Sequence, residues 1–171
     1  MTIRPLSRAS ARELERARED FHGQSTDPLL IASVKETDMS YARQMLESDS
    51  ASTVDADLLA GTIEALSDCA QACIADADAD LRENDPDMVT CIRLCLECTD
   101  VCSATLGVVS RRAAYQDAVT GPLLEACAAT CARCAEECER HADSHAHCMI
   151  CGQACRRCEQ ACRNLLAAAI S

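Results

Sequence analysis

Cysteine is the residue type in this sequence with the greatest capacity for chemistry, since the 171-residue chain contains 15 of them. Most lie in the segments CIRLCLECTDVC, CAATCARCAEEC and CMICGQACRRCEQAC, where they recur at intervals of three and four residues. In an α-helix this spacing, that of heptad a and d positions, places the side chains on one face. Each segment therefore predicts a helix with a single stripe of sulfur. The candidate metal ligands are Cys69, Cys73, Cys91, Cys95, Cys98, Cys102, Cys127, Cys131, Cys134, Cys138, Cys148, Cys151, Cys155, Cys158 and Cys162.

A lining of thiolates is a soft ligand set, which selects copper(I), zinc or iron–sulfur clusters. Zinc prefers separate tetrahedral sets of four ligands, usually on knuckles and loops, and continuous helical stripes do not provide such sets. Copper(I) tolerates two or three ligands and accepts thiolates that bridge to the next ion. If each thiolate bridges two ions, the capacity is on the order of 15 copper(I) ions per chain.

Other uses of the cysteines fit the spacing less well. Neighbours three or four residues apart on a helix have Cβ atoms about 5–6 Å apart, whereas disulfides need roughly 3.5–4.5 Å. The C-x3-C-x2-C triplet of radical enzymes with a 4Fe–4S cluster occurs, but each triplet continues in helical phase to a further cysteine, unlike an open cluster loop. A redox sensor needs exposed thiols of low pKa. A zinc or iron–sulfur binding protein and a thiol redox sensor remain the alternatives to copper(I) binding.

Four helices are expected to position the stripes, because breaks occur at residues 84–86, 121–122 and 142–144. The connections are short, which makes neighbouring helices antiparallel. We predict an all-α protein, with an antiparallel four-helix bundle over residues 54–171. Residues 1–53 contain no cysteine and are mostly polar, so we expect a partly disordered N-terminal arm with a short helix near 40–47. The predicted bundle helices span 55–82, 86–112, 121–141 and 145–168.

One end of this bundle is predicted to be open to ions, and we call it the open end. It gathers the end of the first helix, the start of the second, the end of the third and the start of the fourth. The third stripe continues in phase past Cys138 to His141 and His145, which we predict as metal ligands through which copper(I) enters. His147 is out of phase with that stripe and Met149 points away from it, so neither is included.

Acidic residues extend the first and second stripes at the same end. Asp76 and Asp80 follow the first stripe, while Asp87 and Met88 precede the second. Carboxylates are hard donors, so we expect them to attract cations electrostatically without ligating copper(I). The opposite end, which we call the closed end, is predicted to be plugged by Leu58, Thr62, Leu66, Leu106, Val109, Leu123, Leu124 and Leu166.

Charge and composition limit the partners and the compartment. The formal net charge is −12 and no basic patch is present, so neither nucleic acid nor an anionic membrane is expected as a partner. Neither a signal peptide nor an apolar run of about 18 residues is found, which predicts a cytoplasmic protein. Cytosolic thiols stay reduced, which favours metal binding over disulfides. Without a Ser/His/Asp arrangement, paired carboxylates or a glycine-rich loop, we predict no enzymatic activity.

From about residue 54 to the C-terminus, the phased cysteines resemble those of the copper storage protein family, whose members are four-helix bundles filled with copper(I) by inward-facing cysteines. The lack of an export signal is similar to the cytosolic branch of the family. The resemblance implies that all 15 cysteines, with His141 and His145, are copper ligands. It also implies a homotetramer that stores or detoxifies copper, and a copper chaperone or client protein is a further expected partner. Because the first helix has only two cysteines, fewer ions are expected beside it.

Overall fold

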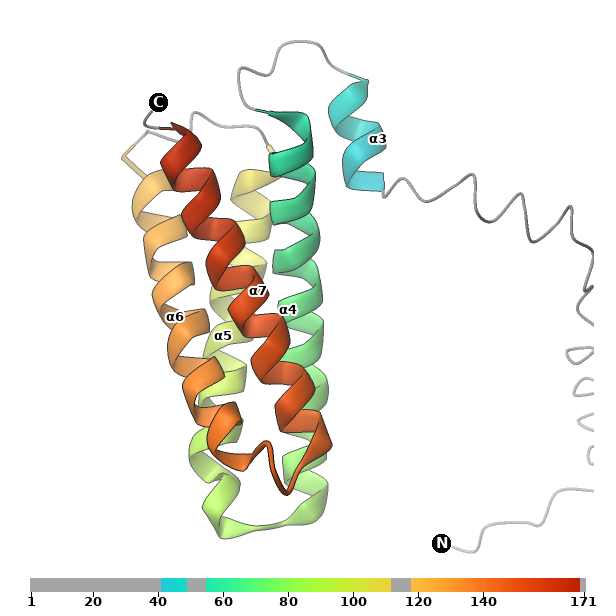
Figure 1. Ribbon diagram of the computed structural model, residues 1–171, viewed down its shortest axis with the longest axis vertical. Helices are drawn as coiled ribbons and strands as arrows, with labels where there is room; N and C mark the ends of the chain where they lie inside the picture. Colours follow the sequence, from blue (N-terminus) through green and yellow to red (C-terminus); the bar gives the residue numbers. More distant parts are fainter. Residues whose placement is uncertain (1–40, 49–54, 112–117, 170–171) are drawn as a thin grey trace, which may run out of the picture. The chain divides into compact units, whose positions relative to one another are not determined.

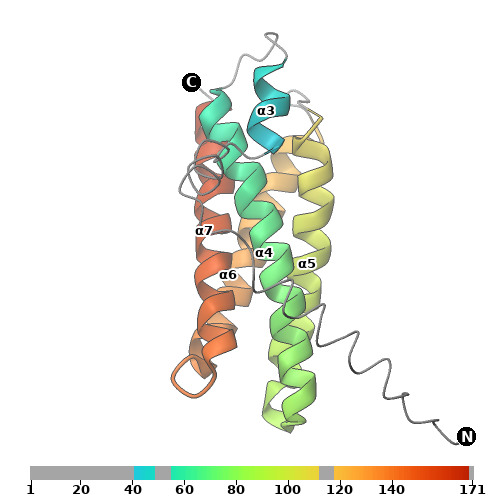
Figure 2. The same cartoon turned by 90° about the vertical axis from the view of Figure 1, so that its right-hand side faces the viewer.

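The structure, a computed structural model, describes residues 41–48, 55–111 and 118–169. All of these residues belong to one compact unit, Met39–Ser171. Four long helices pack as a bundle in which each contacts two neighbours in the cyclic order α4, α5, α6, α7 (Figures 1 and 2). The prediction of an all-α four-helix bundle is confirmed. The helices of the described residues are α3 (Tyr41–Glu47), α4 (Ala56–Glu83), η1 (Pro86–Met88), α5 (Val89–Val109), α6 (Thr120–His141) and α7 (Ala146–Ala169).

Local sequence signals set the ends of α4. The Asp55 carboxylate accepts hydrogen bonds from the backbone N–H groups of Asp57 and Leu58, which caps the first turn. The helix ends at Asn84, whose φ of 54° is left-handed, a conformation that asparagine tolerates better than most residues. Asp85 then caps the short helix η1, in which Pro86 occupies the first turn, where its missing N–H costs little. The chain thereby reverses from α4 into α5 within a few residues.

The second hairpin joins α6 to α7 through residues 142–145, and it lies at the same end of the bundle as the α4–α5 turn (Figure 1). The backbone N–H of His145 donates to the carbonyl of His141 over 3.0 Å, which tightens this turn. Farther along, a Cβ at Gly152 would lie 3.5 Å from the Cβ of Cys138, so α6 and α7 approach closely here. Arg156 also forms two hydrogen bonds with the Glu139 carboxylate across the same pair of helices.

Apolar side chains fill the closed end, as the sequence predicts. Leu59, Leu66, Val109, Leu124 and Leu165 are all fully buried. Two of these, Leu59 and Leu165, were not expected; their chain neighbours, which were, are only partly buried. A shift of one residue on a helix turns a side chain by about 100°, so the exact register needs the structure.

Among the described helices, α4 alone is long and apolar enough to meet the length and hydropathy criteria for a membrane span. Its apolar residues form part of the bundle core, since Cys69, Cys73 and the leucines of its inner face are buried there. The outer face carries exposed acidic residues such as Asp68 and Asp78. The helix is therefore a core element of the bundle.

Helix α3 lies within the segment for which a short helix is expected. Its Leu46 is buried in the same hydrophobic cluster as the bundle core, and Arg43 forms an ion pair with Asp57 at the start of α4. Residues 41–48 therefore pack against α4. The proposed boundary of the arm at residue 53 lies outside the described residues.

Candidate metal centre

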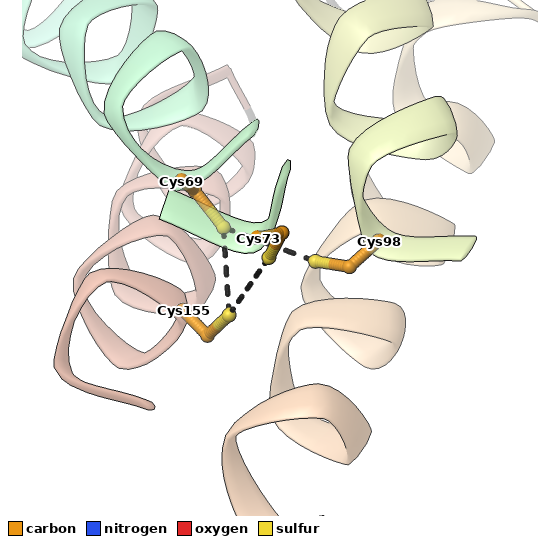
Figure 3. Close-up of side chains that lie close together, drawn as sticks. All are labelled: Cys69, Cys73, Cys98 and Cys155. Atoms are coloured by element: carbon orange, nitrogen blue, oxygen red, sulfur yellow. Dashed lines mark hydrogen bonds between the residues drawn. The ribbon is translucent and has the colours of Figure 1, made fainter. Parts of the chain in front are cut away.

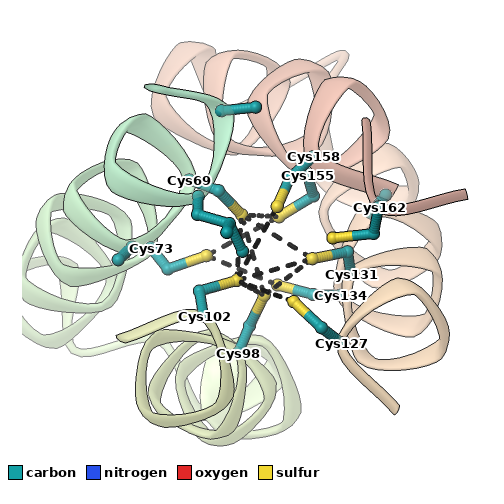
Figure 4. Close-up of a cluster of buried hydrophobic side chains, with 14 of the residues drawn as sticks. Cys69, Cys73, Cys98, Cys102, Cys127, Cys131, Cys134, Cys155, Cys158 and Cys162 are labelled. Atoms are coloured by element: carbon teal, nitrogen blue, oxygen red, sulfur yellow. Dashed lines mark hydrogen bonds between the residues drawn. The ribbon is translucent and has the colours of Figure 1, made fainter. Parts of the chain in front are cut away.

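All 15 cysteines are free thiols and all are buried, with exposed fractions of 0–1%. Together their side chains occupy the space along the axis of the bundle, and we call this set the thiol core. Figure 4 shows the sulfur atoms of α4, α5, α6 and α7 converging on the centre from every side. The heptad spacing therefore does what the sequence predicts, because each stripe faces inward.

Sulfur atoms contact one another throughout the thiol core. Cys69 lies 3.6 Å from Cys155 and 3.8 Å from Cys98, and Cys73 lies 3.6 Å from Cys155 (Figure 3). Nearer the closed end, Cys102 lies 3.5 Å from Cys131. With metal–sulfur bonds of about 2.3 Å, as in zinc thiolates, three sulfurs around one ion lie about 4.0 Å apart. Small side-chain rotations would therefore suffice to admit soft ions.

Groups of four sulfurs, each within 4.8 Å of the others, overlap along the axis. Cys69 belongs to one group with Cys102 and to another with Cys73, and Cys73 belongs in turn to a third group with Cys95. Sets that share sulfurs differ from the separate, closed sets of four ligands that are typical of structural zinc sites. The arrangement suits ions that accept bridging thiolates, as the sequence argument proposed.

Asp76 lies where the thiol core meets the open end. Its side chain is buried, and its Oδ2 atom accepts from the thiols of Cys95 at 3.2 Å, Cys91 at 3.6 Å and Cys138 at 3.6 Å. Asp80, one turn farther along α4, is fully buried, and its Oδ1 atom lies 3.8 Å from the Cys148 sulfur. The expected placement of these two carboxylates at the open end is confirmed. Their contact with sulfur was not expected.

His147 is the histidine that reaches the thiol core. Its Nδ1 atom lies 2.8 Å from Asp76 Oδ1 and 3.4 Å from the Cys148 sulfur, and its Nε2 atom lies 3.0 Å from Glu83 Oε1. The side chain spans the open end from α7 to α4. The sequence pattern places His147 out of phase with the sulfur stripe, whereas in the structure one of its nitrogens faces buried sulfur and the other faces the rim.

The difference between the predicted and the observed position of His147 has a geometric cause. The phase was extended from α6, but the chain turns between His141 and Ala146, so the phase of α6 does not continue into α7. Measured within α7 at 100° per residue, His147 lies only about 20° beyond Cys158, at the edge of the sulfur stripe. Its four-residue spacing from Cys151 was the signal in the sequence.

His141 and His145 pair with carboxylates at the open end. His145 Nδ1 lies 2.8 Å from Glu83 Oε2, while His141 Nε2 lies 3.3 Å from Glu137 Oε1. The ring centroids of His141 and His145 are 6.3 Å apart, and those of His145 and His147 are 5.4 Å apart. The three imidazoles thus form a series of partly exposed rings, of which His147 contacts the Cys148 sulfur. Of the other residues expected here, Asp87 is exposed, Met88 is buried and Met149 is exposed.

Burial and hydrogen bonding shift the titration of the carboxyl groups at the open end. Burial raises the pKa of Asp80 to about 7, and the nearby Cys91 and Asp76 add to this shift. Burial also raises the pKa of Asp76, although the hydrogen bond with His147 opposes it. Glu83 lies nearer the solvent, and its hydrogen bond with His147 lowers its pKa.

The neighbouring imidazole and thiol respond to the same carboxylates. Burial alone would lower the pKa of His147, but its hydrogen bonds with Asp76 and Glu83 outweigh burial, and the net shift is upward. Burial raises the pKa of Cys148, and the negative charge of Asp76 raises it further. Without metal, the Cys148 thiol therefore holds its proton at neutral pH.

A helical bundle with a continuous core of reduced thiols, closed at one end and lined with imidazoles at the other, defines a container for soft metal ions. The sequence pattern of the family described as copper storage protein matches residues 55–167. The chain belongs to this copper storage protein family. No curated protein sequence matches the chain significantly.

Solved structures agree with the family assignment. The Streptomyces lividans copper storage protein Ccsp loaded with 10 copper equivalents is 46% identical, covers 74% of this chain and 98% of its own, and superposes with a TM-score of 0.69. A structure of the cytosolic copper storage protein of the same organism with five coppers is 50% identical, with coverages of 65% and 93% and a TM-score of 0.61. Copper(I)-bound BsCsp3 is 31% identical, with coverages of 61% and 94% and a TM-score of 0.55.

Proposed function

We propose that this protein stores copper(I) in the cytoplasm, bound to the thiolates of all 15 cysteines at about one ion per cysteine. The observation that carries the proposal is the overlap of four-sulfur groups along the axis, in which neighbouring groups share Cys69 or Cys73. Such overlap favours ions joined by bridging sulfur. The relatives loaded with five and 10 coppers support both the metal and a multiple stoichiometry.

Charge balance supports a monovalent cargo. When copper(I) replaces the proton of a thiol, the buried unit of one ion and one thiolate is neutral. A divalent ion held by four thiolates would leave two negative charges in the interior, and buried net charge is costly. A long buried series of thiols therefore fills most easily with singly charged ions, one proton leaving for each ion bound.

We further propose that copper(I) enters past His141, His145 and His147 and reaches the sulfur of Cys148 first. The ring centroids of successive imidazoles lie 6.3 Å and 5.4 Å apart, and the last imidazole nitrogen is 3.4 Å from that sulfur. Imidazole nitrogen is an acceptable copper ligand of intermediate softness. The carboxylates of Asp76 and Asp80 add attraction for a cation at the point where it leaves water.

The decisive experiment is an anaerobic titration of fully reduced protein with copper(I) in competition with a chromogenic chelator, with thiols counted in parallel. We expect saturation near one copper per cysteine, on the order of 15, with helicity unchanged. Met45 and Met149 are exposed thioethers outside the core, so replacing both with alanine is the matched control and should leave capacity unchanged.

Two other outcomes would select the alternative functions. Saturation at one or two ions, or preferential retention of zinc, would indicate a structural or sensing metal site. Rapid formation of disulfides under mild oxidation, with a single cysteine essential, would indicate a redox sensor. The burial of every thiol speaks against the second alternative, because a sensor cysteine must be accessible.

Membership of the family also supports proposals about the oligomeric state, the lack of catalysis and the protein partners. We propose a homotetramer, to be tested by light scattering of the copper-free and loaded protein. We propose a binding role without catalysis, so loss of a measurable turnover on replacing a single cysteine would count against it. A copper chaperone or a client protein is the proposed protein partner, to be tested by copper transfer between purified proteins.

A further inference from the structure

The rim of the open end contains a second set of ligand atoms that face away from the thiol core. Glu83 uses both carboxylate oxygens: Oε2 lies 2.8 Å from His145 Nδ1 and Oε1 lies 3.0 Å from His147 Nε2. These two nitrogens are drawn to one carboxylate from the α6–α7 turn and from α7. One residue of α4 thus gathers two imidazoles at the same point.

The rim set is distinct from the atoms that face sulfur. His147 presents Nδ1 to Asp76 and Cys148, and presents Nε2 to Glu83. An ion at Nε2 therefore uses a different atom from an ion that has reached Cys148. No cysteine sulfur takes part in the rim contacts of Glu83 and His145 among the described residues.

On the core side of His147, a buried carboxyl group has one oxygen without a hydrogen-bond partner among the described residues. Asp80 precedes Glu83 by three residues on the same face of α4, and its Oδ1 atom lies 3.6 Å from His147 Nδ1. Its Oδ2 atom is buried and has no hydrogen-bond partner within the described part of the chain. Together with Asp76, this carboxyl places polar oxygens on the Nδ1 side of His147, an arrangement that orients an imidazole whose other nitrogen binds a metal.

We propose that Glu83, His145 and His147 form a rim site for a borderline divalent cation of the zinc(II) type, with Asp76 and Asp80 orienting the His147 imidazole from its Nδ1 side. Two imidazoles and a carboxylate are a zinc ligand set, with metal–nitrogen and metal–oxygen bonds of about 2.0–2.2 Å. Ligand atoms around a tetrahedral ion of that size lie roughly 3.3 Å apart. The present separations of 2.8 Å and 3.0 Å need only a small widening.

Charge and exposure separate this site from the thiol core. The side chains of Glu83, His145 and His147 are 39%, 22% and 25% exposed, so a hydrated ion can reach them. The carboxylates supply negative charge without leaving it in a sealed interior. An ion bound here lies across the route to Cys148, so zinc is expected to slow the loading of copper(I).

The test uses the full, copper-free, reduced protein under anaerobic conditions with zinc chloride alone. Imidazole 15N resonances and cysteine 13Cβ resonances are recorded as zinc is added. We expect the first equivalent to move the nitrogen resonances of His145 and His147 and to leave the cysteine carbons unchanged. Glu83→Gln should weaken this binding by about tenfold or more, whereas Glu125→Gln, at an exposed position near the closed end, should not.

Two results would contradict the proposed rim site. If the first equivalent moves the cysteine 13Cβ resonances, or if Glu83→Gln binds zinc as tightly as the unaltered protein, the rim site is wrong. Glu83 is partly exposed and outside the core, and the circular dichroism of the variant verifies its fold. Because the readout uses zinc on copper-free protein, the result does not depend on whether the protein stores copper.

Discussion

Asp76 Oδ2 accepts a hydrogen bond from the Cys95 thiol at 3.2 Å, the shortest of the contacts between carboxylate and sulfur given for the described residues. A buried carboxylate therefore lies where the thiol core meets the open end. It accepts from two more thiols and holds His147 through its other oxygen. One residue of α4 thus contacts both an imidazole of the open end and sulfur atoms of the thiol core.

Asp76→Asn should slow the first phase of copper(I) loading by about tenfold, because the negative charge that attracts the ion at the end of its path is lost. Final capacity should stay the same, since no sulfur is removed. Stopped-flow transfer from a copper(I) donor measures both quantities. Asp87→Asn is the control, because Asp87 is exposed on η1. Equal slowing in both variants would show that only the total surface charge matters.

His147→Ala should also slow the first phase and leave capacity within about one ion. The reason is the position of its Nδ1 atom, 3.4 Å from the Cys148 sulfur. Met149→Ala, two residues along the same helix and exposed, provides the comparison in the same stopped-flow assay. Normal kinetics in His147→Ala would mean that ions reach sulfur by another route.

Cysteines at the two ends of the thiol core should behave differently. Cys162→Ala, near the buried Leu165 of the closed end, should lower capacity by about one ion without changing the first phase. Cys148→Ala should lower capacity similarly and slow the first phase, since Cys148 contacts His147. Chelator competition gives the capacity, and donor transfer gives the rate. A slow first phase in Cys162→Ala would contradict loading from the open end.

Leu66→Ala should destabilise the copper-free protein by about 2–5 kcal/mol, because it opens a cavity in the plug of the closed end. Leu81→Ala, at a 61% exposed position of the same helix, should change stability little. Urea unfolding followed by circular dichroism measures both. Loading with copper should raise the stability of each variant, because the thiolates gathered in the folded core bind the ions more tightly than the unfolded chain does. A variant that copper fails to stabilise would indicate that ions bind outside the four-helix core.

The buried Asp80 carboxyl should make the stability of the copper-free protein depend on pH. Its folded pKa is raised from 3.8 to about 7, so the folded state binds more protons than the unfolded state between these values. Its contribution is favourable below about pH 4 and is lost as the pH rises towards 7. Asp80→Asn should remove most of this loss, which for a shift of about three pKa units is on the order of 4 kcal/mol, and should raise Tm at neutral pH by roughly 10 °C. Parallel Tm profiles from pH 4 to 8 for both proteins would rule this out.

The sequence was sufficient for the features that depend on helical period. Thirteen of the cysteines lie in α5, α6 and α7, and their spacing alone predicts that each stripe faces the axis. The turns at Asn84 and Pro86 are also readable, because they use residues suited to a left-handed end and to a first helical turn. The stripes, the turns and the short connections that make neighbouring helices antiparallel all depend on residues that are close together in the sequence.

Features that depend on contacts between helices were less accessible. The side-chain pairing of His147 with Asp76 joins residues 71 positions apart, and no local pattern indicates it. Likewise, Asp76 and Asp80 were expected to attract ions at a distance, yet both contact cysteine sulfur directly. Leu46 of α3 joins the core cluster through a contact with the bundle that the polar composition of its segment does not suggest.

Because every cysteine is buried, bound copper does not alter the surface that a partner protein contacts along the helices. Each copper(I) that replaces a thiol proton leaves the net charge unchanged, so the outer surface of an empty and a full protein carries the same formal −12. Surface recognition along the helices therefore conveys nothing about how much metal is inside. Only the histidines and carboxylates of the open end change with occupancy, so a partner that distinguishes a full store from an empty one must sense it there.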